Sequence, residues 1–489
     1  MGEKRYPSHD VPQTSRRGHV IIMSTVEDRG TVANITIVGG GSTHWTPRLL
    51  VDFANTPSLS GSQIVLMDVA ADSLPPMLQL AGHVAKKRDI ELTATATTEL
   101  DSALAEAEIV LTTLSVGGFA SMRHDLEIPA RFGVRQPVGD SVGPGGISRS
   151  LRSIPVMLGI ARAMERRCPG ALLVNVSNPL TALCRAVTRE TSVRAVGLCN
   201  ELVGLTWMLS LLFDADLRAI DPVVGGVNHL PLVTALRIGG ADGFAMLRDL
   251  IEEPGPRASE PIWMAPPPAT HWRKASDTDK WTKGDVLANN RLKFELFRRF
   301  GVLPGSADTH VAEFFPGFVT ENSDFGRDWG VHHYGLAGHQ ADKVDDDAAL
   351  EALLASDEIP AWPSGELVAP LLEALVTGSD ASLPVNLPNT GQVVNVDRGA
   401  VVECIGVAGA SGVAPRDCVR VESVLGEYLR QISMSQELTV EAACTGNRTK
   451  VVEAMLTDQM ASRLPYENVL AMTDELLAAT APWLPQFAS

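Results

Sequence analysis

The chain has 489 residues, which is enough for two or three domains. Hydrophobic residues make up 45% of it and charged residues 20%, and these values exclude a largely disordered chain. The 58 acidic residues against 41 basic ones give a formal net charge of −17, which excludes a general nucleic-acid binder. No apolar run approaches the roughly 20 residues of a membrane helix, so we expect neither nucleic acid nor a membrane as a partner.

The first residues and the cysteines indicate the compartment. Residues 1–33 are polar and mixed, and the apolar segment Val20–Met23 is too short for a signal-peptide core. We therefore expect a disordered N-terminal extension without an export signal. The six cysteines are scattered without close pairs, which fits a reducing cytoplasm better than a disulfide framework.

From residue 34 onward, short apolar runs rich in β-branched residues alternate with helical segments. The expected strands are 34–38, 64–67, 91–96, 109–113, 171–176 and 195–198. The expected helices are 47–53, 73–88, 102–107, 149–167, 180–190 and 202–213. This alternation predicts βαβ units and a parallel sheet, so residues 34–222 are predicted to form a Rossmann-like α/β domain.

The remainder, residues 223–489, has a different pattern and is predicted to form an α+β domain. Two strands are expected at 223–229 and 232–237. Residues 252–285 are rich in Pro, Trp and polar residues, and such long irregular segments are often lids or binding loops. Helices are expected near 286–300, 344–355, 364–376, 416–433, 437–459 and 467–479.

A glycine cluster follows the first expected strand and precedes a helix. Gly39, Gly40, Gly41 and Ser42 stand where a backbone can approach a pyrophosphate at a helix N-terminus. Asp68 follows the second strand, where a carboxylate would accept hydrogen bonds from a ribose diol and repel a 2′-phosphate. This context predicts NAD rather than NADP. Because the cluster is not a clean G-x-G-x-x-G motif, a plain glycine-rich turn is the alternative.

A second loop supports the same interpretation. The segment 113–118, which contains Ser115 and Gly117, follows a later strand and would face the same carboxyl edge of the sheet. It is predicted to contact the cofactor, and an ordinary strand-to-helix loop is the alternative.

Two candidate metal ligands follow strands as well. Cys199 and Asn200 come directly after the strand at 195–198, and Asn228 and His229 follow the run that begins at Val223. A thiolate and a neutral imidazole bind divalent transition metals, and two protein ligands would leave positions for substrate. On spacing alone, a buried thiol and a structural histidine are the more common interpretation.

Whole motifs favour the metal. The chain resembles glycoside hydrolase family 4, the NAD- and metal-dependent glycosidases, over most of residues 34–460. The resemblance rests on stretches in the family's order: ITIVGGGSTHWTPRLL from Ile35, RHDLEIPARFGVRQPVGDSVGPGGISRSLRSI from Arg123, NVSNPLTAL from Asn175, GLCNE from Gly197, GVNHL from Gly226 and VNLPNTGQVVNVDRGAVVE from Val385. It implies a Rossmann-like fold related to lactate and malate dehydrogenases, followed by a domain for substrate, metal and oligomerisation.

The resemblance implies a role for each matching position. Cys199 and His229 are expected to bind manganese or another divalent metal. Asn178 is expected to contact both sugar and cofactor. Asn200 matches a variable position that tracks substrate type, and it is expected to take part in catalysis. The remaining expected cofactor contacts are Gly39, Gly41, Ser42, Asp68, Ser115 and Gly117. The remaining expected substrate contacts are Arg123, Arg152 and Asn228, and for each arginine a surface or capping role is the alternative.

The family's chemistry differs from that of glycosidases with two catalytic carboxylates. The resemblance implies oxidation of the sugar at C3 by NAD, removal of the C2 proton, elimination of the aglycone, addition of water and return of the hydride. The expected partner is a small glycoside, and a homodimer or homotetramer is expected.

The chain departs from the family at the base that removes the C2 proton. Phe314 stands where many members have a tyrosine, and phenylalanine cannot accept a proton. The candidates for the base are Asp285, Asp308, His310 and Tyr334. His310 is the most natural, since its unperturbed pKa lies near neutrality, although a structural histidine is equally consistent with the sequence. For the two aspartates, helix capping is the favoured alternative.

The residues after the strand at 195–198 do not indicate one substrate class. Cys199-Asn200 is similar to members that act on phosphorylated β-glycosides, whereas Glu201 is similar to members that act on uronic acids. The pair His44-Trp45 in the glycine-loop helix would line the pocket or pack the first helical turn. Two other functions stay open: an NAD-dependent sugar or hydroxy-acid dehydrogenase, and a protein that senses NAD without turnover.

Overall fold

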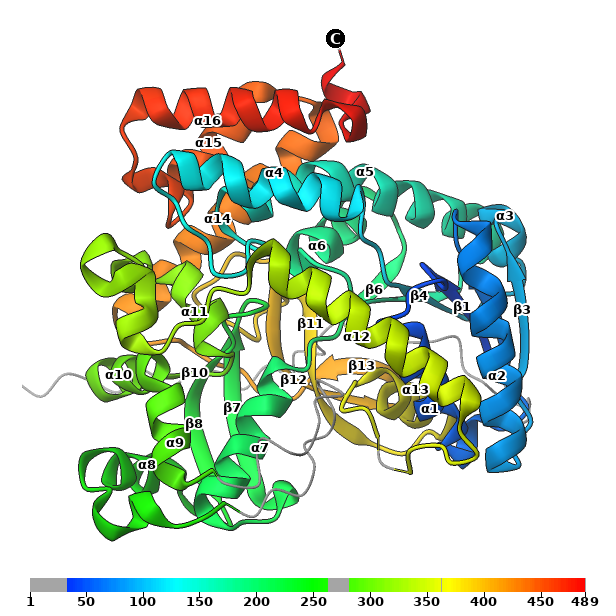
Figure 1. Ribbon diagram of the computed structural model, residues 1–489, viewed down its shortest axis with the longest axis horizontal. Coiled ribbons are helices and arrows are strands. Elements are labelled where there is room, and N and C mark those ends of the chain that lie inside the picture. Colours follow the sequence, from blue (N-terminus) through cyan, green and yellow to red (C-terminus); the bar gives the residue numbers. More distant parts are fainter. Residues whose placement is uncertain (1–32, 263–280, 362, 489) are drawn as a thin grey trace, which may run out of the picture.

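The computed structural model describes residues 33–262, 281–361 and 363–488. The expected N-terminal extension, except for residue 33, and residues 263–280 of the irregular segment lie outside the described residues. Figure 1 shows one central sheet with helices against it. The described helices include none that is long and apolar enough to cross a membrane.

The sheet has thirteen strands in the described chain, and its path runs β10-β8-β7-β12-β11-β6-β5-β4-β1-β2-β3. The parallel half is formed by β1 (Asn34–Val38), β2 (Gln63–Met67), β3 (Thr93–Thr97), β4 (Ile109–Thr112), β5 (Leu172–Asn175) and β6 (Arg194–Gly197). The antiparallel half is formed by β7 (Ile220–Gly226), β8 (Leu232–Ile238), β9 (Ala241–Asp242), β10 (Leu303–Pro304), β11 (Ala381–Pro388), β12 (Val401–Gly409) and β13 (Gly412–Pro415). The predicted strands of the parallel half are thus confirmed.

Strands β11 and β12 join the two halves, and the sequence analysis did not predict them. Asn386 of β11 pairs with Gly197 of β6, and Glu403 of β12 pairs with Gly226 of β7. Prolines disfavour a central strand, and β11 contains Pro384, so the sequence pattern concealed it. The sheet therefore continues from the expected first domain into the expected second, and the division at residue 222 stays a prediction.

Helices cover both faces of the parallel half (Figure 1). Ile37 and Leu111 face a core that includes residues of α1, α2 and α13, whereas Val38 and Val110 face α5, α6 and the C-terminal helices. Neighbouring residues of a strand point to opposite faces, so the continuous apolar runs are explained by burial on both sides.

Each predicted helix overlaps an α-helix of the structure, but many of the predicted ends differ from the observed ones. The predicted helices at 416–433 and 437–459 are instead α14 and α15, and the predicted helix at 286–300 is divided into α9 and α10. Helices α4, α8 and α11 were not predicted. The α-helices are α1 (Thr46–Ala54), α2 (Leu74–Arg88), α3 (Leu100–Ala103), α4 (Gly118–Arg131), α5 (Gly143–Arg167), α6 (Leu180–Glu190), α7 (Glu201–Phe213), α8 (Gly243–Glu252), α9 (Lys283–Asn289), α10 (Arg291–Phe300), α11 (Asp308–Phe314), α12 (Gly335–Ala355), α13 (Val368–Thr377), α14 (Ser423–Thr445), α15 (Arg448–Thr457) and α16 (Tyr466–Ala479).

Candidate active site

The glycine loop follows β1 and leaves little room for side chains. The N–H groups of Gly39 and Gly40 both donate to the carbonyl oxygen of Met67, at 2.9 Å. Gly39 has a φ of +93°, and a Cβ there would collide with the backbone and side chain of Thr113. Only glycine suits this position, since a positive φ strains other residues.

Asp68 closes the loop at the end of β2. Its two carboxylate oxygens accept the N–H groups of Gly41 and Ala70, each at 3.0 Å. Beside it, Val69 is 87% exposed, so an apolar side chain stands open to solvent next to the carboxylate. Ser42 caps the following turn by accepting the N–H of Trp45 at 3.1 Å.

The loop after β4 lies beside the glycine loop, as the sequence predicted. The N–H of Thr113 donates to Val38 at 2.9 Å, which ties the two loops together. Gly117 has a φ of +78° and precedes α4, and the carbonyl of Ser115 accepts the N–H of Gly118 at 3.2 Å. The predicted cofactor residues thus meet at the carboxyl edge of the parallel strands.

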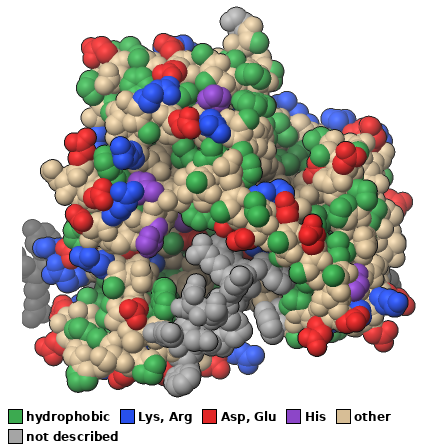
Figure 2. Space-filling model, in the orientation of Figure 1, with side chains coloured by type: hydrophobic (Ala, Val, Ile, Leu, Met, Phe, Trp, Pro, Cys, Tyr) green, Lys and Arg blue, Asp and Glu red, His purple; other side chains and the backbone are tan. Residues whose placement is uncertain are grey.

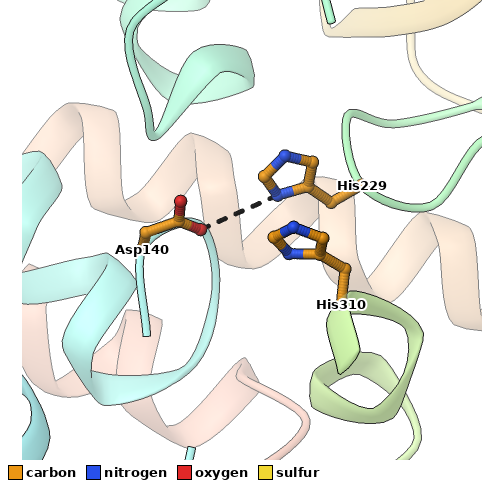
Figure 3. Close-up of side chains that lie close together, drawn as sticks. All are labelled: Asp140, His229 and His310. Atoms are coloured by element: carbon orange, nitrogen blue, oxygen red, sulfur yellow. Dashed lines mark ion pairs between the residues drawn. The ribbon is translucent and has the colours of Figure 1, made fainter. Parts of the chain in front are cut away.

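Next to this edge, three side chains from distant segments converge: Asp140, His229 and His310. Their candidate ligand atoms all lie within 4.8 Å of one another (Figure 3). The rings of His229 and His310 are stacked, with centroids 3.8 Å apart, and Nδ1 of His229 lies 3.7 Å from Oδ1 of Asp140. One carboxylate and two imidazoles form a donor set that suits a divalent transition metal.

Hydrogen bonds hold this metal-competent group in place. The Ser141 hydroxyl donates to Asp140 at 2.9 Å and contacts Nδ1 of His229 at 2.8 Å. With Nδ1 protonated toward Ser141, His229 keeps the lone pair of Nε2 for a metal, which is a common supporting arrangement. Asn178 Nδ2 donates to the other oxygen of Asp140 at 2.9 Å.

The electrostatics of the group favour a bound cation. Burial opposes ionisation of Asp140, but His229, His310 and Arg149 together hold its pKa below the usual range. Burial, aided by His310, lowers the pKa of His229 to about 4. At neutral pH the group therefore offers a carboxylate and an uncharged imidazole, the forms that bind metal ions.

Cys199 is not a member of this group, but it lies directly beside it. The side chain of Asn228, the neighbour of His229, lies close enough to the thiol to lower its pKa, although burial outweighs this effect. Burial, with Glu403 and Glu201, raises the pKa of the thiol well above its usual value. Asn228 Nδ2 also donates to Glu403 at 3.4 Å, so the predicted substrate contact Asn228 has polar protein partners.

Asn200 and Glu201 face different neighbours. The amide of Asn200 donates to Glu366 at 3.0 Å, and burial raises the pKa of Glu366 to about 7. Oε1 of Glu201 lies 3.9 Å from Nε2 of His310, and its Oε2 accepts the N–H of Ala307 at 2.6 Å. Asn200 is therefore hydrogen-bonded to a carboxyl group that can change its protonation near neutral pH.

Of the four candidate bases, the two aspartates have helix-capping roles. Asp285 forms a capping box with Thr282 at the start of α9, and its side chain is exposed. Asp308 is buried and accepts two backbone N–H groups at the start of α10. These contacts explain both residues without catalysis.

The two other candidate bases lie at the site. His310 belongs to the metal-competent group, and its Nδ1 is buried without a hydrogen-bond partner in the described chain. The hydroxyl of Tyr334 is likewise buried and unpartnered there, and its ring packs edge-on against His339 with centroids 4.7 Å apart. Phe314 is 1% exposed and belongs to the apolar core.

The two predicted substrate arginines lie in contrasting places. Arg123 is exposed on α4, with Glu127 at 3.7 Å. Arg152 is 1% exposed, and its guanidinium donates to both oxygens of Asp125 and to the carbonyl of Val116. The structure therefore gives Arg152 a complete set of protein partners.

We predict that replacing Arg152 with methionine mainly destabilises the protein. The change would leave the carboxylate of Asp125 buried without its cation, which costs about 3–5 kcal/mol. Urea unfolding should show this loss, and the KM of any folded fraction should stay near the wild-type value. A large rise in KM with unchanged stability would instead establish Arg152 as a substrate contact.

The sequence analysis did not assign several residues of this site. Asp140 and Arg149 lie within the long motif that begins at Arg123, but no local pattern marks them as site residues. His339 on α12 and Glu366 before α13 lie outside all quoted motifs.

Comparison with known proteins identifies the family. The family 4 glycosyl hydrolase model matches residues 34–214, and the model of that family's C-terminal domain matches residues 224–461. The chain belongs to family 4 of the glycosyl hydrolases. The family resemblance noted in the sequence is thereby confirmed.

Curated members of family 4 align over nearly the whole chain. An alpha-galactosidase of Bacillus subtilis (strain 168) is 27% identical over 462 residues, covering 93% of this chain and 99% of the relative. An alpha-galacturonidase of Thermoanaerobacterium saccharolyticum is 28% identical over 478 residues, covering 93% and 97%.

Solved structures confirm the predicted fold of this family 4 enzyme. The lplD protein of Bacillus subtilis superposes with a TM-score of 0.80 at 24% identity, covering 91% of this chain and 99% of that one. A Thermotoga maritima 6-phospho-beta glucosidase, solved with manganese, NAD+ and glucose-6-phosphate, has a TM-score of 0.72 at 17% identity, covering 92% and 99%.

Proposed function

We propose that this family 4 enzyme hydrolyses a glycosidic bond by transient oxidation of the sugar at C3, removal of the C2 proton, elimination of the aglycone and addition of water. The observation that carries the proposal is the convergence of Asp140, His229 and His310, with Asp140 bonded to Asn178 just after the carboxyl end of β5. The names of the relatives, glycosidases with NAD and manganese in solved structures, support it. When bound, NAD supplies a hydride acceptor and donor, and manganese supplies a Lewis acid for the sugar oxygens.

The residues at the glycine loop fit a dinucleotide. The close packing at Gly39 and Gly41 keeps side chains out of the loop, since a Cβ at Gly41 would collide with Ser73. Asp68 has acceptor capacity for a ribose, and the exposed Val69 offers an apolar surface for a base. Ser115, Gly117 and Asn178 complete the set that we assign to the cofactor.

The donor set beside the loop fits a divalent ion. Asp140 and His310 lie around His229, and the thiol of Cys199 lies near Asn228, the residue before His229. We propose that His229 holds the ion together with donors from these groups. Nδ1 of His310 is buried and has no hydrogen-bond partner in the described chain. Buried polar atoms normally have partners, so this nitrogen is consistent with a site that binds a ligand.

The protein's own groups must also move protons. If His310 binds the metal, Tyr334 is the candidate for the base that removes the C2 proton. Its hydroxyl oxygen is buried and has no hydrogen-bond partner in the described chain. Glu366, with a pKa raised to about 7 and bonded to Asn200, is suited to donate a proton near neutral pH. We do not propose Asp285 for proton transfer, because its carboxylate caps α9.

We further propose that residues 34–222 form the nucleotide-binding domain and residues 223–489 the substrate and oligomerisation domain. The chain is proposed to act in the cytoplasm as a homodimer or homotetramer. The six cysteines are free in the structure, which agrees with a reducing compartment.

The proposal is tested by following an aryl glycoside in D2O with NAD+ and Mn2+. We expect nitrophenol release without net accumulation of NADH, and deuterium at C2 of the released sugar. The deuterium is expected because C2 loses its proton to the protein and regains one from solvent. A screen of nitrophenyl glycosides, glucuronides and phosphoglycosides provides the substrate.

The same experiment decides between this proposal and a dehydrogenase. Phe314 in place of a tyrosine is the observation that keeps the dehydrogenase open. NADH that accumulates in proportion to oxidised product, without release of nitrophenol, would overturn hydrolysis. Binding of NAD without metal uptake or turnover would instead indicate a sensor.

A further inference from the structure

Glu403 is a buried acidic residue in the middle of the sheet, and it has no part in the chemistry proposed above. It lies on β12, between β11 and β7, and its side chain is 0% exposed. Its partners on the neighbouring strands are Asn386 on β11 and Gly226 on β7, and Asn386 pairs in turn with Gly197 on β6. Glu403 therefore belongs to a row of paired residues that crosses four strands.

The two ends of this row lead to candidate metal ligands. The chain continues from Gly197 at the end of β6 to Cys199, and from Gly226 at the end of β7 to His229. Cross-strand partners have their side chains on the same face of a sheet. The side chain of Glu403 is therefore well placed to influence how the two loops lie relative to each other.

The loop of His229 is a tight turn. The N–H of Leu230 donates to the carbonyl oxygen of Val227 at 2.9 Å, and the N–H of Val227 donates to the carbonyl oxygen of Leu230 at 3.3 Å. Asn228 and His229 are the two residues between them, and His229 has a φ of +65°, which is uncommon for a residue with a side chain. The direction of the imidazole thus depends on how this turn is held.

Glu403 binds this turn and the neighbouring strand through one oxygen. Nδ2 of Asn228 donates to Oε2 of Glu403 at 3.4 Å, and Nδ2 of Asn386 donates to the same oxygen at 3.3 Å. The two asparagines are 2% and 1% exposed, so no solvent competes for these bonds. The carboxyl group therefore links the turn of His229 to β11, which pairs with the end of β6.

Stability does not explain this cluster of Asn228, Asn386 and Glu403. Three of its oxygens are buried without a hydrogen-bond partner in the described residues: Oδ1 of Asn228, Oδ1 of Asn386 and Oε1 of Glu403. A polar cluster that is only partly satisfied is less favourable than an apolar core of similar volume. Departures of this kind from the packing rules are expected where a site must be held in a defined geometry.

We propose that Glu403 is a positioning residue for the metal site: through Asn228 and Asn386 it fixes the turn of His229 relative to the strand end that leads to Cys199. This inference rests on the proposed function, because it concerns the ion of that same site. Glu403 acts through its neighbours and is not itself assigned as a ligand. Replacing a side chain that orients metal ligands typically weakens metal binding by about 10- to 100-fold.

The test measures the affinity for manganese, with free Mn2+ followed by electron paramagnetic resonance during a titration. E403L removes both acceptor oxygens at similar volume, and we expect its affinity to fall by about 10- to 100-fold. E403Q keeps a carbonyl oxygen that can accept both amides, so its affinity should stay within about threefold of wild type. Both variants should bind NAD as wild type does, because the glycine loop lies at β1 in the parallel half of the sheet.

Two controls define the specific signal. Figure 2 shows histidine side chains gathered on the face that it draws, and exposed imidazoles also bind manganese. His229→Ala therefore serves as the blank, and only the binding that depends on His229 is compared. L476A is the control for lost stability, since Leu476 is 2% exposed in a different apolar core. It should melt at a lower temperature but keep its manganese affinity within about threefold of wild type.

A readout in the metal-free protein tests the positioning itself. The amide of Leu230 closes the turn, and its hydrogen exchange should be at least about tenfold faster in E403L than in wild type and E403Q. Unchanged exchange or manganese affinity in E403L would overturn the proposal. So would a loss of affinity in E403Q or L476A as large as that in E403L.

A second variant covers the case in which E403L does not fold. Asn386→Leu removes one of the two amides and leaves Asn228 bonded to Glu403, so manganese affinity should fall by at least about threefold. Wild-type affinity in Asn386→Leu would overturn the proposal equally.

The result is separable from that of the proposed function. If E403L loses manganese as expected but wild type hydrolyses no glycoside, the positioning role stands and the proposed function fails. If wild type hydrolyses a glycoside but E403L binds manganese as tightly as wild type, the positioning role fails alone.

Discussion

Replacing His229 with alanine is expected to abolish tight metal binding and to lower kcat/KM by about 10³-fold, the scale for losing one electrostatic stabiliser of a transition state. His229 stacks on His310, faces Asp140 and follows Asn228, whose side chain lies near the thiol of Cys199. His229 is therefore a candidate ligand whether the ion is also bound by Asp140 and His310 or by Cys199. Bound manganese, measured after dialysis, and the rate on an aryl glycoside check this result.

The control for His229→Ala is His332→Ala, because His332 is an exposed histidine outside the metal-competent group. It should retain manganese and activity. The variants Cys199→Ser and His310→Ala then show which side chain binds the ion together with His229. The variant that loses more manganese identifies that ligand. Full manganese retention in His229→Ala would refute the assignment of the metal to this position.

Replacing Gly39 with alanine is expected to weaken NAD binding by at least tenfold and to destabilise the protein by about 2–4 kcal/mol. The φ of +93° strains any residue with a Cβ, and that Cβ would overlap both the carbonyl and the hydroxyl of Thr113. Because Thr113 begins the second cofactor loop, the two loops must separate. Calorimetric titration with NAD and urea unfolding measure the two effects.

Gly82→Ala is the matched control for Gly39→Ala. Gly82 lies in α2 with an exposed position and nothing within 4 Å of a Cβ, so alanine should raise stability by about 0.5–1 kcal/mol and leave NAD binding unchanged. Unchanged NAD affinity in a folded Gly39→Ala protein would show that the loop does not hold the cofactor.

Local patterns in the sequence were sufficient for the parallel half of the sheet. Strands β1, β4 and β5 are short, mostly apolar runs that are buried on both faces, and Gly39 and Thr113 follow β1 and β4 at the carboxyl edge. β11 was concealed because its prolines contradict a strand, and its neighbours β6 and β12 support it through long-range pairing. A strand that is stabilised by pairing with distant segments is difficult to predict from the residues of a short stretch of sequence.

The sequence by itself determined the family, the glycine loop with Asp68 and the prediction that His229 belongs to a metal site. These depend on motifs in which the backbone conformation or the donor chemistry is encoded within a few residues. Only the tertiary structure decided that Asp140 and His310 lie against His229, and that Arg152 is bound by Asp125. The reason is physical: whether a charged side chain is paired depends on which distant segments the folded sheet brings to its edge.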